Sequence, residues 1–179
     1  ALKAQTTASN NVAVGWQAGT ATTTGASNTF LGQYSGAANT TGNYNTAVGA
    51  LSLDANTTAA NNTAVGYQAG TAVSTGGNNT LIGYQAGDSI TTGQYNTALG
   101  DRALPTATTV SSNTAIGYAA LYTNAAANNT AVGASALFAN TTGTQNVAVG
   151  ATALDANTTG GYNTSVGGNS LTTLTTGSD

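Results

Sequence analysis

The pentapeptide Asn62-Thr63-Ala64-Val65-Gly66 shows the unit from which this chain is built. Versions of it recur ten times in the 179 residues, and the closing Gly is spaced by 17 residues at every step except one, where the spacing is 16. Such a fixed period is typical of solenoids and other repeat architectures, so the repeat decides the fold. The ten motif glycines are Gly15, Gly32, Gly49, Gly66, Gly83, Gly100, Gly117, Gly133, Gly150 and Gly167.

An Asn lies four residues before each of these glycines, without exception. When equivalent residues stack in successive coils, amides can donate and accept along the column, which predicts a hydrogen-bonded ladder. A second interpretation is that Asn only suits the backbone conformation of a corner before the strand. Both interpretations are structural. The ten asparagines are Asn11, Asn28, Asn45, Asn62, Asn79, Asn96, Asn113, Asn129, Asn146 and Asn163.

The other positions of the repeat are also restricted. A β-branched residue stands three before the Gly and Val, Leu or Ile directly before it, so we expect this pair to share the inward face of a strand. Ala or Ser three after the Gly predicts a narrow interior. Seven repeats carry a second Gly ten residues after the first, which we expect at a corner with φ > 0. Each repeat is therefore expected to hold two short strands separated by Gly turns.

These observations predict an all-β fold, a parallel β-solenoid or β-roll of ten coils of about 17 residues, forming a single repeat domain over residues 1–179. Thr, Val, Asn and Gly are poor helix formers, which excludes helical repeats. Stacking at the β spacing gives a rod of roughly 48 Å. Because a lone rod has two open β-edges and a thin core, we expect it to be a segment of a longer, three-chain fibre.

One position predicts how the interior is filled. The residue four after the motif Gly is Leu in six repeats and Gly in the other four, at Gly19, Gly36, Gly70 and Gly87. Each of those four repeats carries an aromatic residue shortly after its motif Gly. Close packing then predicts that the ring covers the space left by the missing Leu. The aromatic residues are Trp16, Tyr34, Tyr67 and Tyr84.

The composition argues against most chemistry. Only 4% of residues are charged, the net charge is −3, and Glu, His and Cys are absent. We therefore expect no catalytic residue, no metal site and no cofactor, and interpret Asp54, Asp88 and Asp155 as turn residues. Two cationic side chains cannot neutralise a phosphate backbone, so nucleic acid is not an expected partner. No apolar stretch is long enough for this segment to insert in a membrane.

The pentapeptide followed by x-x-Ala or x-x-Ser, as in residues 62–69 and 129–136, resembles the head repeats of trimeric autotransporter adhesins, which read Asn-Ser-Val-Ala-Ile-Gly-x-x-Ser. Similar repeats occur in phage tail fibres. The resemblance implies a left-handed parallel β-roll, association into a homotrimer, and an extracellular location on a cell surface or in a virion fibre. It also implies that the β-branched and aliphatic residues face the interior. The period here is longer than that family's usual unit, with the extra residues in the Thr-Thr-Gly segment.

Three functions are compatible with these residues. The leading expectation is a non-enzymatic structural or adhesive fibre segment with a cell-surface or glycan receptor. The first alternative is an ice-binding protein that uses a repetitive Thr face, although adjacent residues on a strand point to opposite sides. The second alternative is a subunit that assembles end to end into filaments. The Thr-Thr pairs that motivate the ice-binding alternative begin at Thr23, Thr40, Thr57, Thr91, Thr108, Thr141, Thr158 and Thr175.

Overall fold

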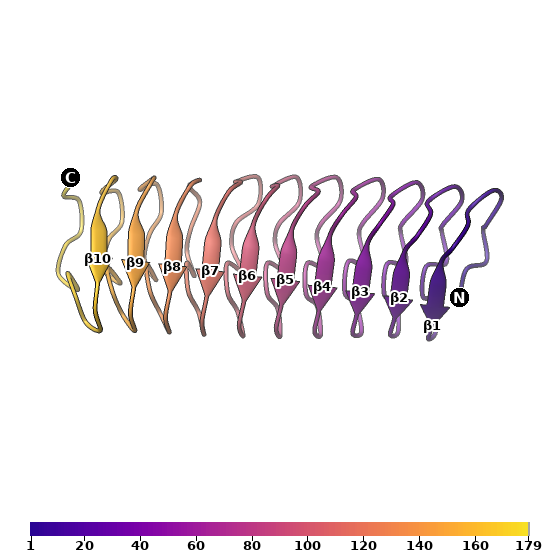
Figure 1. Ribbon diagram of the computed structural model, residues 1–179, viewed down its shortest axis with the longest axis horizontal. Coiled ribbons are helices and arrows are strands. Elements are labelled where there is room, and N and C mark those ends of the chain that lie inside the picture. The colour runs from indigo at the N-terminus through magenta and orange to yellow at the C-terminus, as the bar shows by residue number, and fades with distance from the viewer. Residues whose placement is uncertain (179) are drawn as a thin grey trace.

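Each repeat contributes one three-residue strand, and the ten strands form one parallel sheet along the side of a solenoid (Figure 1). The structure is a computed structural model that describes residues 1–178. Consecutive strands are neighbours throughout the sheet, which confirms the predicted all-β solenoid with tandem coils. The strands are β1 (Val12–Val14), β2 (Thr29–Leu31), β3 (Thr46–Val48), β4 (Thr63–Val65), β5 (Thr80–Ile82), β6 (Thr97–Leu99), β7 (Thr114–Ile116), β8 (Thr130–Val132), β9 (Val147–Val149) and β10 (Thr164–Val166).

Equivalent residues of successive coils lie side by side. Thr63 pairs with Thr80, seventeen residues on, and Thr114 pairs with Thr130 across the one 16-residue repeat. The short repeat therefore keeps the register of the sheet. Its missing residue is accommodated at the corner between Asn124 and Asn129, where the Asn124 side chain donates to the Ala126 carbonyl at 2.6 Å.

The prediction of a second strand in each coil is wrong. After the motif Gly, every second residue adopts a left-handed conformation, as at Leu51 (φ 60°) and Leu53 (φ 48°). A strand needs extended dihedrals at consecutive positions, so the segment after the motif Gly cannot be a strand. This segment is still hydrogen-bonded to the next coil, since the Leu53 backbone N–H donates to the Ala69 carbonyl at 3.1 Å. That bond and full burial of the Leu offset the strain of its backbone.

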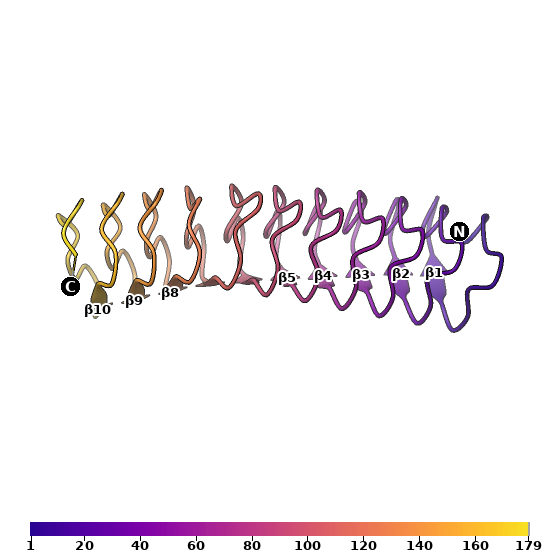
Figure 2. The same cartoon turned by 90° about the horizontal axis from the view of Figure 1, so that it is seen from above.

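The predicted inward face of the strands is also wrong, as is the interior placement implied by the adhesin resemblance. The middle residue of the strand, such as Ala64 in β4, is fully buried, whereas Thr63 and Val65 on either side of it point outward and are only half-buried. The Asn before the strand has the same parity as the middle residue and is buried with it. Figure 2 shows the strands along one side of the stack and the turns along the other.

The second Gly, present in seven of the ten repeats, has a different role from the one predicted. The motif glycines have φ between 125° and 139°, but positive φ does not occur at Gly25 or its equivalents. At Gly25 a Cβ would collide with the carbonyl oxygen of Gly42 and lie 2.9 Å from the Asn39 amide nitrogen. Glycine is needed there because two coil backbones and a buried side chain approach closely, not because of its dihedral freedom.

Two large side chains, and not the exposed aromatic rings, fill the space at the four Leu-to-Gly positions. Phe30, in the middle of β2, lies against both Gly19 and Gly36, and Leu81, in the middle of β5, lies against both Gly70 and Gly87. The predicted covering by Trp16, Tyr67 and Tyr84 is wrong, because these residues are 63%, 46% and 44% exposed. Tyr34 is half-buried, but the atoms nearest Gly36 belong to Phe30. One strand residue thus replaces the Leu of two coils.

This packing predicts a rescue. Phe30→Ala should lower stability by about 3–5 kcal/mol, because it leaves a cavity that spans two coils. Adding Gly19→Leu and Gly36→Leu should recover most of the loss, since coils with a buried Leu, such as that of Leu53, carry Ala in the middle of the strand. Urea unfolding followed by circular dichroism measures both changes.

The control is Gly36→Leu in the presence of Phe30, which should destabilise because the new side chain would meet the ring. Equal losses of stability in Phe30→Ala and in the triple variant that adds Gly19→Leu and Gly36→Leu would contradict the compensation.

Candidate functional site

The ten asparagines form one continuous column inside the solenoid. From Asn28 onward, the backbone N–H of each column Asn donates to the side-chain oxygen of the Asn in the preceding coil, at 2.8 to 3.1 Å. Seven of the side-chain amides donate to the same oxygen at 3.1 to 3.3 Å. The side chain also closes its own coil: Asn79 Nδ2 donates to the carbonyl of Gly93, fourteen residues on, at 2.9 Å.

The corner conformation belongs to the residue before the column. Asn61, Asn78 and Tyr95 have φ of 60°, 61° and 58°. The column Asn that follows each of them is not left-handed. The geometry therefore favours the ladder interpretation over the corner interpretation for the column.

A second internal ladder was not predicted. Asn56 donates to Asn39 at 3.0 Å, Asn140 to Asn124 at 2.7 Å, and Asn157 to Asn140 at 3.0 Å, all buried. This column lies seven residues after the motif Gly and is interrupted in the middle of the rod, where its members are Val73, Ile90 and Ala107. The signal in the sequence is the 17- or 16-residue spacing of these asparagines.

The Thr-Thr pairs have a structural role. The first hydroxyl of a pair donates to the backbone carbonyl of the next coil, as Thr40 Oγ1 does to the Thr57 carbonyl at 3.0 Å. The same carbonyl accepts the backbone N–H groups of Thr40 at 2.8 Å and Thr41 at 3.2 Å. Equivalent hydroxyl bonds start from Thr23, Thr57, Thr91, Thr141 and Thr158. Only the second Thr of each pair is consistently exposed, so the pairs do not present a two-row hydroxyl face.

The outer face of the sheet is a regular surface that runs along the rod. It consists of a row of Thr, with Val at Val12 and Val147, and of an aliphatic row, and we call it the Thr/aliphatic face. Leu31 and Leu99 are 44% and 42% exposed, and each of the other aliphatic residues of the row is either half-buried or exposed. No residue of the ten strands is charged. The aliphatic row is Val14, Leu31, Val48, Val65, Ile82, Leu99, Ile116, Val132, Val149 and Val166.

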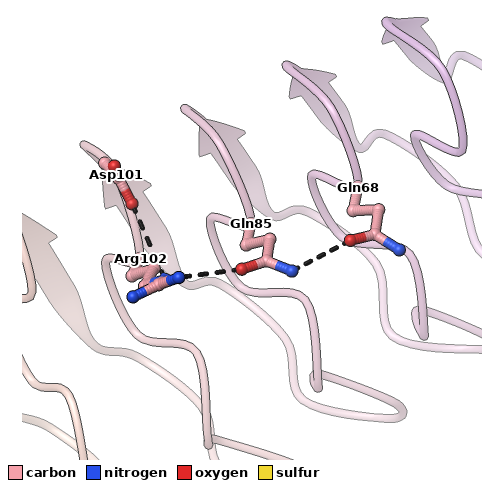
Figure 3. A network of polar contacts seen from close by, with 4 residues as sticks. All are labelled: Gln68, Gln85, Asp101 and Arg102. Carbon is pink, nitrogen blue, oxygen red and sulfur yellow. Dashed lines mark hydrogen bonds and ion pairs between the residues drawn. The ribbon is translucent and has the colours of Figure 1, made fainter.

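A local polar network lies where the chain leaves the strands of three consecutive coils (Figure 3). Gln85 Nε2 donates to Gln68 Oε1 at 2.9 Å, and Arg102 Nε donates to Gln85 Oε1 at 3.4 Å. Arg102 Nε also lies 4.0 Å from an Asp101 carboxylate oxygen. The rings of Tyr67 and Tyr84 stack beside it with centroids 5.7 Å apart.

The three aspartates that we interpreted as turn residues are not brought together in the part of the chain that the structure describes. Asp54, Asp88 and Asp155 share one column but are never in adjacent coils. Burial raises the pKa of Asp54, and it raises the pKa of Asp88 against the opposing effect of hydrogen bonds at Ser89 and the charge of Arg102. Among residues 1–178 there is no cluster of three metal-binding side chains and no enclosed pocket, and no helix that could cross a bilayer.

Comparisons with known proteins returned no matching family, curated protein or solved structure. The repeat motif itself is therefore the ground for any likeness to the adhesin heads.

The amide column predicts that an Asn-to-Asp change lowers stability strongly only where the Asn is buried in the column. Asn79→Asp removes the donor to Asn62 and to the Gly93 carbonyl and buries a carboxylate, so stability should fall by at least about 2 kcal/mol at pH 7. The matched control is Asn78→Asp, one residue away and exposed, which should change stability by less than about 0.5 kcal/mol.

The loss in Asn79→Asp should shrink below the raised pKa expected of the buried acid, because the protonated carboxyl can again donate. Urea midpoints at pH 7 and pH 3 measure both effects. Similar losses for the two variants would contradict the ladder as a source of stability.

Proposed function

We propose that this chain is a structural segment of an extracellular fibre, in which copies associate through the Thr/aliphatic face. The observation that carries the proposal is the continuity of that face: ten in-register strands present an uncharged aliphatic row from Val14 to Val166, and five of its ten members are at least 36% exposed. Contiguous apolar surfaces of this extent on a water-soluble chain mark interaction sites. The surface chemistry thus favours association along the rod.

The interior gives a second argument for association. The core of the chain is built mainly from Ala, with one Leu, Phe, Ile or Val in most coils, so the apolar area that a lone coil buries is small. The branched residues of the strands contribute little to it, because they lie outside. Burying them between copies would add the missing apolar contact without changing any coil. Three copies around a common axis is the arrangement implied by the adhesin resemblance.

The association predicts a clear dependence on this face. Wild-type protein should sediment as a trimer in analytical ultracentrifugation, and the double variant Val65→Lys, Val132→Lys should sediment as a monomer, because each Lys would place a charge in the apolar contact. The matched control is Thr58→Lys, Thr142→Lys, which places the same charges on the exposed second-Thr row.

Circular dichroism verifies that both variants keep the coil. A wild-type monomer at tens of micromolar would contradict the proposal, and mass growing without limit with concentration would favour end-to-end filaments.

A second function is favoured by one observation on the same face. Thr and aliphatic side chains two residues apart on the strand point outward together, which forms a lattice of methyl and hydroxyl groups with steps of about 6.6 Å along the strand and about 4.8 Å between coils. This is the two-residue spacing that the Thr-Thr pairs lack. An uncharged array of this kind can order water, so ice binding is a candidate for a chain that exposes the face.

Ice binding is tested by thermal hysteresis. If the face binds ice, wild-type protein should show a freezing-point gap at millimolar concentration, and Thr63→Tyr should abolish most of it by breaking the flat lattice. Thr58→Tyr, on the exposed second-Thr row, should leave it unchanged. Absence of hysteresis in the wild type removes this function and leaves association intact.

A further inference from the structure

Two rows of residues border the Thr/aliphatic face along the rod. The first, which we call the entry row, consists of the residue two before each strand, and the second, the exit row, consists of the residue two after it. Every residue of the entry row is exposed, and in the exit row only Ala50 is half-buried. The entry row is Asn10, Ser27, Tyr44, Asn61, Asn78, Tyr95, Ser112, Asn128, Gln145 and Tyr162, and the exit row is Trp16, Gln33, Ala50, Tyr67, Tyr84, Asp101, Tyr118, Ala134, Ala151 and Gly168.

Aromatic residues occur in both rows but never in both rows of one coil. Where the entry residue is aromatic, the exit residue of the same coil is short, and the three pairs are Tyr44–Ala50, Tyr95–Asp101 and Tyr162–Gly168. Where the exit residue is aromatic, the entry residue is Asn or Ser, and the four pairs are Asn10–Trp16, Asn61–Tyr67, Asn78–Tyr84 and Ser112–Tyr118. The other three coils have no aromatic residue in either row.

The structure of a single chain does not account for this alternation. Every entry residue has a positive φ, which Asn adopts readily and which is unfavourable for a bulky residue, yet Tyr44 (58°) and Tyr162 (63°) adopt it. Tyr44, Tyr95 and Tyr162 are 66%, 62% and 63% exposed, so burial in their own chain does not offset this cost. The two border residues of one coil lie beyond opposite ends of a strand, so a ring in one row takes no space from the other row.

Contact between copies gives the alternation a cause. When parallel rods meet through the Thr/aliphatic face around a common axis, the entry row of one copy faces the exit row of the next. Rigid rods keep a constant separation, so their interface packs evenly only when each level holds a similar volume. With equal coils at the same level, seven levels hold one ring and one short residue, and no level holds two rings.

A shift by one coil removes this match in either direction. One shift sets Tyr44 against Tyr67. The same shift sets Tyr95 against Tyr118, and the opposite shift sets Tyr95 against Tyr84. Two rings then meet at a level where other levels hold one, which overpacks the interface at that point. The border rows therefore distinguish the register of equal coils from its nearest alternatives.

We propose that the entry and exit rows form the seams between copies, and that the alternation of bulky and short residues fixes a parallel association with equal coils in register. The entry row of each copy contacts the exit row of the next. The inference rests on the proposed association through the Thr/aliphatic face, and it deepens that proposal by naming the direction, the register and the residues that set them.

The test exchanges residue size between the two rows. Ala50→Trp adds a second ring at the level of Tyr44 and should raise the Kd of self-association at least about tenfold in sedimentation equilibrium, because that level becomes overpacked. The coil accepts a ring at this position, since Trp16 and Tyr67 occupy it in other coils. The double variant Ala50→Trp, Tyr44→Ser should restore the wild-type Kd, because a short residue again faces the ring.

The matched control is Ala134→Trp, the same substitution in the same row at a level where the entry residue is Asn128. It should change the Kd by less than about threefold, and circular dichroism verifies that all variants keep the coil. Equal effects of Ala50→Trp and Ala134→Trp, or a double variant that stays as weak as Ala50→Trp, would overturn the seam.

Disulfide cross-linking tests the direction and the register. The chain has no Cys, and a disulfide requires two Cα atoms within about 7 Å of each other. Gln145→Cys, Ala151→Cys places a thiol in each row of one coil, so air oxidation with copper phenanthroline should link chains covalently on a denaturing gel. Ser112→Cys, Ala151→Cys lies two coils out of register and should give at least about fivefold less product, because the thiols are offset by roughly 10 Å along the rod. Equal yields from the two pairs would contradict the register.

Sedimentation of the wild type separates this inference from the proposed fibre. A wild type that associates, but whose Kd responds equally to the two Trp substitutions, refutes the seams and leaves association through the Thr/aliphatic face intact. A wild type that sediments as a monomer refutes the association and the seams together.

Discussion

The rest of the structure depends on the buried amide column that joins each coil to the next. A single Asn side chain bonds the backbone and the side chain of its neighbours along the rod and also reaches across to a carbonyl of its own coil. It thereby sets the distance between coils and the width of one coil together. With so little aliphatic volume available inside, satisfied polar groups are what make this narrow interior unique.

The remaining constraints follow from that closeness. Where backbone approaches backbone, as between Gly25 and Gly42, only glycine fits. In the segment after the motif Gly, residues such as Leu53 take a left-handed conformation that the neighbouring coil stabilises. The column of Ala and Ser three after the motif Gly, fully buried from Ala18 to Ala153, leaves room for the larger residues that follow or face it. The 16-residue repeat is tolerated because its deletion lies at a corner and leaves the column and the strand unshifted.

The period, the strand positions and the small-residue column could be predicted from the sequence, because stacking repeats them at fixed spacing. The direction of the strand side chains could not. In Thr63-Ala64-Val65 the largest apolar residue suggests an inward Val, but Asn62 and Ala64 share the opposite parity, and the amide needs the interior more than the Val does. Ala carries almost no information on burial. The role of Phe30 was missed for a related reason. Its side chain fills space in two coils, whereas the repeat pattern relates a missing Leu only to residues of its own coil.

The inverted strand has a consequence for function. A β-branched or aliphatic residue that is fully buried in the core would need no further reason to recur, but in this solenoid these residues lie on the outer side of the strand and are only partly buried. Ten consecutive coils nevertheless keep Val, Leu or Ile at the exposed end of the strand, where any polar residue would be more soluble. The association proposed along the whole sheet would give that row a role. A partner of equal length and equal repeat fits such an association with no change of register, and another copy of the same rod is the simplest such partner.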